Sequence, residues 1–160
     1  MSEIVSKLAC RIRDETVELT RITERVGRAW ESANRSGDDL YLDSVALNIH
    51  GFYDGLESIL LKIAYLIDGT VPSGANWHEL LLQEMSKEIE GVRPAVFSRA
   101  FCDKMDAYRG FRHVVRHVYA YKFNPDKLKV LVDNLPDTLR MACDELLAFA
   151  DFLEQVTFNE

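Results

Sequence analysis

The strongest constraint on the fold is an apolar repeat that steps by three or four residues along most of the chain. Its clearest run comprises Leu42, Val45, Ile49, Phe52, Leu56, Ile59, Ile63 and Leu66. An α-helix has about 3.6 residues per turn, so these steps place the apolar side chains along one side of a helix. Asp38 and Asp39 precede the run, and Gly69 follows it as a natural C-cap.

Similar but weaker stripes predict further helices on both sides of this one. A long helix is expected over about residues 2–35, and another over about 94–122, with Pro94 in its first turn. Between the second and this last segment, Asn76 is expected to cap a short helix over residues 77–89.

The last third of the chain repeats the apolar stripe over residues 128–156. Asn124 is a good N-cap, and Pro125 suits the first helical position. Pro136 lies inside the stripe, and the uninterrupted rhythm predicts a kinked helix rather than two helices.

With 160 residues, 8 glycines and 4 prolines, the composition favours one domain and disfavours a many-stranded fold. We therefore expect an all-α protein: an antiparallel four-helix bundle with a short additional helix, in a single domain over residues 1–160. Charged residues interrupt the N-terminal segment early, and no apolar run approaches the roughly 20 residues of a membrane span. The protein is expected to be soluble and cytoplasmic, with no membrane partner.

Charge is concentrated in one segment. The whole chain carries −7, whereas residues 99–122 contain six basic and two acidic side chains. On a helix, Arg109, Arg112, Arg116, His113 and His117 fall within about 140° of arc. No acidic residue occurs between positions 109 and 122. Since arginines four apart repel each other, such a face is expected to meet anions, phosphate above all.

The other side of this predicted helix is apolar and is expected in the core; it carries Phe111, Val114, Val115 and Val118. Tyr119 falls at the border, on the side of Arg112 and two turns beyond it. Tyr121 falls among the apolar positions and is interpreted as structural.

Arg112 to Tyr119 reads R-x4-H-x-Y, which resembles the signature of the HEPN superfamily and, within it, the HepT-like toxins. Members are helical bundles with this motif late in the third long helix, an architecture with which the whole chain is compatible. HepT-like toxins commonly have Asn directly after the arginine. This chain has His113 there, and is similar to other HEPN proteins in carrying another polar residue.

The resemblance implies a metal-independent endoribonuclease, and the side chains suit that chemistry. Cleavage needs a base for the ribose 2′-OH, an acid for the leaving 5′-oxygen and a cation for the phosphorane charge. His117 is the candidate for proton transfer and Arg112 for the phosphate clamp. His113 orients the phosphate or shares the acid–base work, and Arg109 and Arg116 bind RNA. The chemistry requires no cofactor, and the arginines argue against a metal at the two histidines.

Further implications concern partners. The resemblance implies a homodimer whose two motifs meet, and an MNT-type nucleotidyltransferase antitoxin that silences the toxin by adding AMP to Tyr119. The alternative is a non-catalytic helical module that binds RNA, nucleotide or a protein through the same basic face. The remaining histidines are interpreted structurally, His50 as a boundary residue with a satisfied hydrogen bond and His78 as a surface or capping residue.

Overall fold

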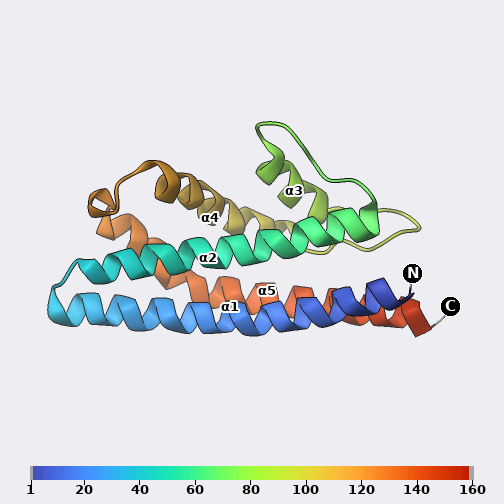
Figure 1. Cartoon of the computed structure of the whole chain (residues 1–160), viewed down its shortest axis with the longest axis horizontal. Helices are drawn as coiled ribbons and strands as arrows, with labels where there is room; N and C mark the ends of the chain where they lie inside the picture. Colours follow the sequence, from blue (N-terminus) through green and yellow to red (C-terminus); the bar gives the residue numbers. More distant parts are fainter. Residues whose placement is uncertain (1, 159–160) are drawn as a thin grey trace.

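The computed structural model describes residues 2–158, in which four long helices pack side by side and one short helix lies outside them (Figure 1). The bounds are α1 Ser2–Ser36, α2 Leu40–Ile63, α3 Trp77–Met85, α4 Arg99–His117 and α5 Pro125–Phe158, with short turns η1 Ala64–Asp68 and η2 Ala120–Lys122. Helices α1, α2, α4 and α5 alternate in direction along the chain. The predicted all-α antiparallel bundle is confirmed. Within residues 2–158, no helix is long and apolar enough to cross a membrane.

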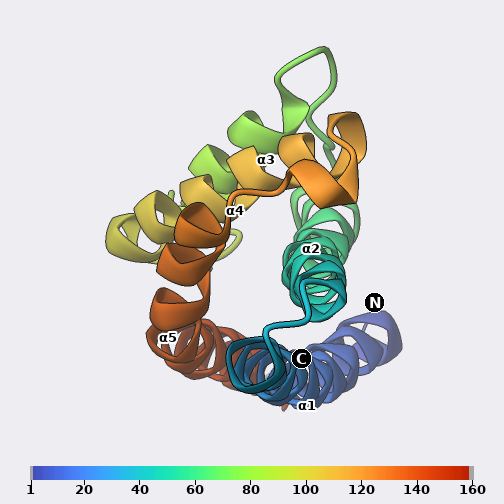
Figure 2. The same cartoon turned by 90° about the vertical axis from the view of Figure 1, so that its left-hand side faces the viewer.

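The apolar stripes form the core that the sequence predicts. Seen end-on, α1, α2, α4 and α5 surround a common interior (Figure 2). Its side chains include Ile12, Leu19, Val45, Ile49, Phe52, Leu56, Met105, Leu135, Leu146 and Phe149, all buried. Burying such side chains provides the main driving force for this arrangement.

The ends of α2 also follow the sequence. The N–H of Leu40 donates to the Asp38 carboxylate at 3.0 Å, which satisfies one free donor of the first turn. At the other end the helix widens into the π-helical turn η1 and stops at Gly69, whose φ of 71° is the left-handed conformation of a C-cap.

Helix α5 begins as expected and remains continuous through Pro136. The Asn124 side chain accepts a hydrogen bond from the N–H of Asp126 at 2.9 Å, so it caps the first turn that Pro125 begins. Figure 1 shows the first turns of α5 running at an angle to the rest, as a proline inside a helix predicts.

The expected bounds of α4 are wrong at both ends. The helix begins at Arg99 because Ser98 caps it, accepting a hydrogen bond from the N–H of Phe101 at 3.2 Å. It ends at His117, since Val118 is extended with φ −121° and ψ 138°. The β-branched and aromatic residues around this point have low helix propensity, and the chain turns through η2 toward α5.

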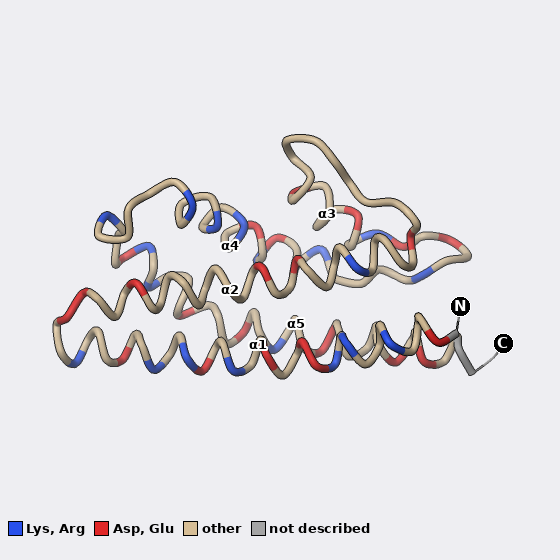
Figure 3. Tube along the Cα trace, in the orientation of Figure 1, with Lys and Arg blue, Asp and Glu red and all other residues tan. Residues whose placement is uncertain are grey.

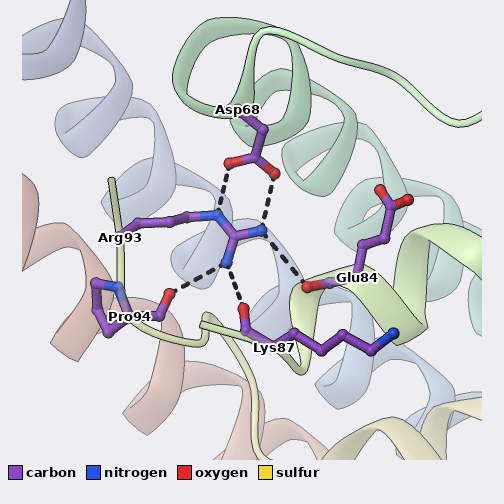
Figure 4. Close-up of polar contacts among 5 residues, drawn as sticks. All are labelled: Asp68, Glu84, Lys87, Arg93 and Pro94. Atoms are coloured by element: carbon purple, nitrogen blue, oxygen red, sulfur yellow. Dashed lines mark hydrogen bonds and ion pairs between the residues drawn. The ribbon is translucent and has the colours of Figure 1, made fainter. Parts of the chain in front are cut away.

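Helix α3 ends at Met85 rather than residue 89 because the chain folds back over it. The Met85 carbonyl accepts hydrogen bonds from the N–H groups of Val96 and Phe97. Beside this turn, the buried Arg93 forms two hydrogen bonds to the Asp68 carboxylate (Figure 4). Arg93 thus ties the loop after α3 to the end of α2.

Candidate functional site

Arg109, Arg112 and Arg116 lie on the second half of α4, and Lys122 lies in the turn that follows it (Figure 3). The structure gives the arginines of this face different surroundings. Arg109 lies 2.7 Å from the Asp106 carboxylate, one turn earlier in α4, whereas the exposed Arg116 has no ion pair within the described residues. The expectation of a basic face free of acids is therefore wrong in part, because Asp106 reaches Arg109 and Asp54 of α2 reaches Arg112.

Arg112 is held against α2. Its side chain is 19% exposed, and Nε lies 3.5 Å from Oδ1 of Asp54. This is an ion pair without a hydrogen bond, and the buried Nε has no other partner in the described residues. The other Asp54 oxygen lies 3.1 Å from Nδ1 of His50, one turn earlier in α2. Asp54 thus joins His50 and Arg112.

Asp54 is the residue of this site that the sequence analysis missed. Its spacing of four from His50 indicates only that the two share a face of α2. Nothing in the sequence shows that this face meets Arg112. The hydrogen bond expected to satisfy His50 is also incomplete, since its buried Nε2 has no partner among the described residues.

The two histidines of α4 are exposed and stacked, with ring centroids 4.1 Å apart and planes 23° from parallel. His117 Nδ1 donates a hydrogen bond to the carbonyl oxygen of His113 at 2.8 Å. Because a carbonyl only accepts, Nδ1 carries a proton, and Nε2 of the neutral ring is free to accept one. Arg112 and His117 are five positions apart, which is about 140° around the helix axis. Within one chain, the two residues therefore lie on different sides of α4.

Tyr119 lies outside α4, so its expected alignment with Arg112 two turns along the same helix is wrong. Its side chain is 71% exposed, and that of Tyr121 is 76% exposed. The interpretation of Tyr121 as structural is also wrong. The rings stack with centroids 5.8 Å apart and planes 10° from parallel, and Lys122 Nζ lies 5.8 and 5.9 Å from their centroids.

The apolar side of α4 is only partly covered. Phe111 packs on Phe123, with centroids 6.0 Å apart, and contacts the core. Val114 and Val118 are 36% and 37% exposed, so the expectation that they lie in the core is wrong. Val114 lies in the last turn of α4, and Val118 is the first residue beyond it.

A second polar cluster joins α2 to α3. Nδ1 of His78 lies 2.5 Å from the buried Glu57 carboxylate, and its ring is tilted by 30° against that of Trp77, with centroids 3.6 Å apart. His78 therefore serves neither as a surface residue nor as a cap. Burial is the main cause that raises the pKa of Tyr53, and the charge of Glu57 adds to it. Within residues 2–158, no group of three or more His, Cys, Asp or Glu side chains is placed to hold a metal ion.

A family model described as HepT-like protein matches residues 44–153, which run from α2 through α4 and most of α5. The match includes every residue of the R-x4-H-x-Y motif. No curated protein and no solved structure shows significant similarity to the chain. Because the match covers more than half of the sequence, this chain belongs to the family of HepT-like proteins.

Proposed function

We propose that this protein is a metal-independent endoribonuclease, the toxin of a HEPN/MNT-type toxin–antitoxin pair. The family supports a ribonuclease of the toxin type. The observation that carries the proposal to this chain is the hydrogen bond that His117 Nδ1 donates to the His113 carbonyl. This bond leaves Nε2 of the exposed ring available to accept a proton.

In the proposed reaction, His117 Nε2 takes the proton of a ribose 2′-OH as general base. The 2′-oxygen attacks phosphorus, the bond to the 5′-oxygen breaks, and a protonated histidine supplies that oxygen with its proton. The products are a 2′,3′-cyclic phosphate and a 5′-hydroxyl. His113 or the second His117 of a dimer is the candidate acid.

The arginines supply the charge that this reaction needs. The contact of Arg112 with Asp54 uses Nε, and no hydrogen bond within the described residues uses its two terminal nitrogens. These nitrogens are free to donate to a phosphate and to its developing charge. Arg116 and Arg109 attract the neighbouring phosphates, Arg116 more strongly because Asp106 offsets Arg109.

The test is cleavage of a single-stranded RNA by the purified protein in excess EDTA. We expect cleavage to persist, to yield cyclic-phosphate ends and to stop at a position where the ribose is replaced by 2′-deoxyribose. An oligonucleotide that is bound but never cut would favour the alternative, a non-catalytic binding module. Cleavage that EDTA abolishes would contradict the metal-independent mechanism.

Asp54 is proposed as a positioning residue, because it acts on RNA only through Arg112. We expect Asp54→Asn to lower kcat by about 10- to 100-fold, since a small misplacement of a reacting group has effects of that size. KM should fall as well, because Asp54 no longer offsets the charge of Arg112. Asp103→Asn, which removes an exposed carboxylate that pairs with Arg99, is the matched control and should change neither value. An unchanged kcat in Asp54→Asn would show that Asp54 does not position Arg112 for catalysis.

A homodimer is proposed to bring the two motifs together, with the faces from Arg109 to Tyr119 opposed across a two-fold axis. Two observations support it. Arg112 and His117 of one chain face different sides of α4, and Val114 and Val118 leave apolar surface uncovered. Sedimentation at micromolar concentration should give the mass of a dimer, and a monomer would exclude the shared site.

Tyr119 is proposed as the residue to which the antitoxin, a nucleotidyltransferase, adds AMP. Its exposed side chain is accessible to another enzyme. After co-expression with such a partner, intact-mass measurement should show added AMP units and loss of cleavage, because the phosphates compete with RNA for the nearby cations. Tyr119→Phe should remove the increments, and Tyr121→Phe is the control that should keep them. Increments that persist in Tyr119→Phe would place the modification elsewhere.

A further inference from the structure

The turn after α4 exposes two aromatic rings that the fold does not need. Tyr119 and Tyr121 are both largely exposed, and no hydrogen bond within the described residues uses either phenol. Tyrosine rings normally bury much of their surface. Two parallel rings left in solvent at the end of a basic helix are therefore a candidate binding surface.

The backbone that presents these rings is ordered. The N–H of Lys122 donates to the Tyr119 carbonyl at 2.9 Å, and the N–H of Phe123 donates to the Ala120 carbonyl at 3.1 Å. Phe123 then packs on Phe111 of α4, which anchors the turn on the bundle. The backbone that carries the rings is thus set before any ligand arrives, which reduces the entropic cost of binding.

The surface around the rings is cationic. Lys122 Nζ lies within 6 Å of both ring centroids, at 5.8 and 5.9 Å, and has no acidic partner within the described residues. Arg116, in the last turn of α4, has no ion pair within the described residues either. Exposed aromatic rings beside free cations suit a ligand that combines a flat aromatic group with negative charge, as a nucleotide does.

The spacing of the rings fixes where such a group would sit. A base inserted between two rings needs about 6.8 Å, twice the separation of stacked bases. The centroids of Tyr119 and Tyr121 are 5.8 Å apart, which leaves too little room for a base between the rings. A base therefore stacks on an outer face of the pair.

We propose that Tyr119, Tyr121 and Lys122 form a stacking platform for an unpaired RNA base next to the scissile phosphate, an inference that rests on the proposed function. Four residues of chain span at most about 14 Å, so a base on Tyr121 lies within a few nucleotides of His117. Only an unstacked base offers its face to a ring. The platform thus selects single strands and loops over duplex RNA.

The test measures binding, so it is independent of cleavage. A short, fluorescently labelled single-stranded RNA with 2′-O-methyl groups cannot be cut and reports affinity by anisotropy. We expect Tyr121→Ala to weaken binding by about 5- to 150-fold, the range for loss of one base–aromatic stack. Tyr121→Phe keeps the ring and should stay within about twofold. Tyr65→Ala removes an equally exposed tyrosine at the far end of α2 and is the matched control (Figure 1).

An abasic nucleotide scanned along the same RNA identifies the stacked base. At one position, the abasic substitution and Tyr121→Ala should each weaken binding, and together they should weaken it no further. Independent effects at every position would overturn the platform, as would a Tyr121→Ala variant that binds RNA like the wild type. If Tyr121→Ala binds RNA like the wild type but no longer binds a protein partner, the two rings form a protein-binding surface instead. Wild-type protein that binds no RNA at all would overturn the proposed function itself.

Discussion

Replacing His117 with alanine should slow RNA cleavage by about 10²- to 10⁴-fold, the usual effect of removing a general acid or base. The side chain is exposed and its one hydrogen bond goes to the backbone carbonyl of His113, so its loss leaves the core untouched. The melting temperature should therefore change little. The measurement is the single-turnover rate of RNA cleavage in EDTA, with circular dichroism as a check on the fold.

His113→Asn is the matched control for this variant. It leaves the backbone carbonyl that fixes His117 in place and introduces the residue that HepT-like toxins commonly have after the arginine. A much smaller loss of activity in His113→Asn than in His117→Ala would assign the acid to the second His117 of a dimer, and an equal loss would assign it to His113. If His117→Ala cuts RNA at the wild-type rate, His117 does not transfer the proton.

Replacing Arg93 with methionine should destabilise the bundle by about 3–5 kcal/mol, since it leaves the Asp68 carboxylate buried without its partner. All five N–H donors of Arg93 have acceptors in the structure. Nε and Nη2 donate to Asp68 at 2.6 and 2.8 Å, and the others reach the backbone carbonyls of Lys87, Pro94 and Glu84 (Figure 4). No water competes for this guanidinium, because its side chain is fully buried.

For a chain of this length, that loss corresponds to a fall in melting temperature of roughly 6–20 °C. Lys87→Ala is a sharp control, because Lys87 contributes only its backbone carbonyl and should melt like the wild type. Arg99→Met removes an exposed arginine and should shift stability by less than about 1 kcal/mol. The double variant Arg93→Met with Asp68→Leu should recover part of the loss, since no unpaired charge remains. An Arg93→Met protein that melts normally would contradict this account.

The sequence predicts those features of this molecule that depend only on residues close to one another along the chain. The apolar period, the cap at Asn124 and the left-handed Gly69 are local, and all are found in the structure. The end of α4 is harder to predict because apolar periodicity continues through Val118 while its β-branched neighbours disfavour a helix. A helical wheel extended past His117 therefore placed both tyrosines wrongly.

The sequence does not predict which residues of different helices contact each other. The pairing of Asp54 with Arg112 depends on how α2 and α4 rotate against each other, and a stripe on each helix leaves several rotations open. Arg93 likewise stands in a loop without periodicity, so nothing in its neighbourhood indicates a partner 25 residues earlier in the chain. Composition thus indicates the basic residues of the site, but it does not indicate that Asp106 and Asp54 pair with two of them.

The position of the histidines at the carboxyl end of α4 has an electrostatic consequence. The peptide dipoles of a helix sum to a partial negative charge at this end, whereas phosphates in many proteins are bound at the positive amino end. For the proposed RNA substrate, the helix that carries the site repels a phosphate beside His117, and Arg116 in its last turn offsets that repulsion. The electrostatic part of the proposed RNA binding thus comes from side-chain cations alone, and this binding should weaken steeply with added salt.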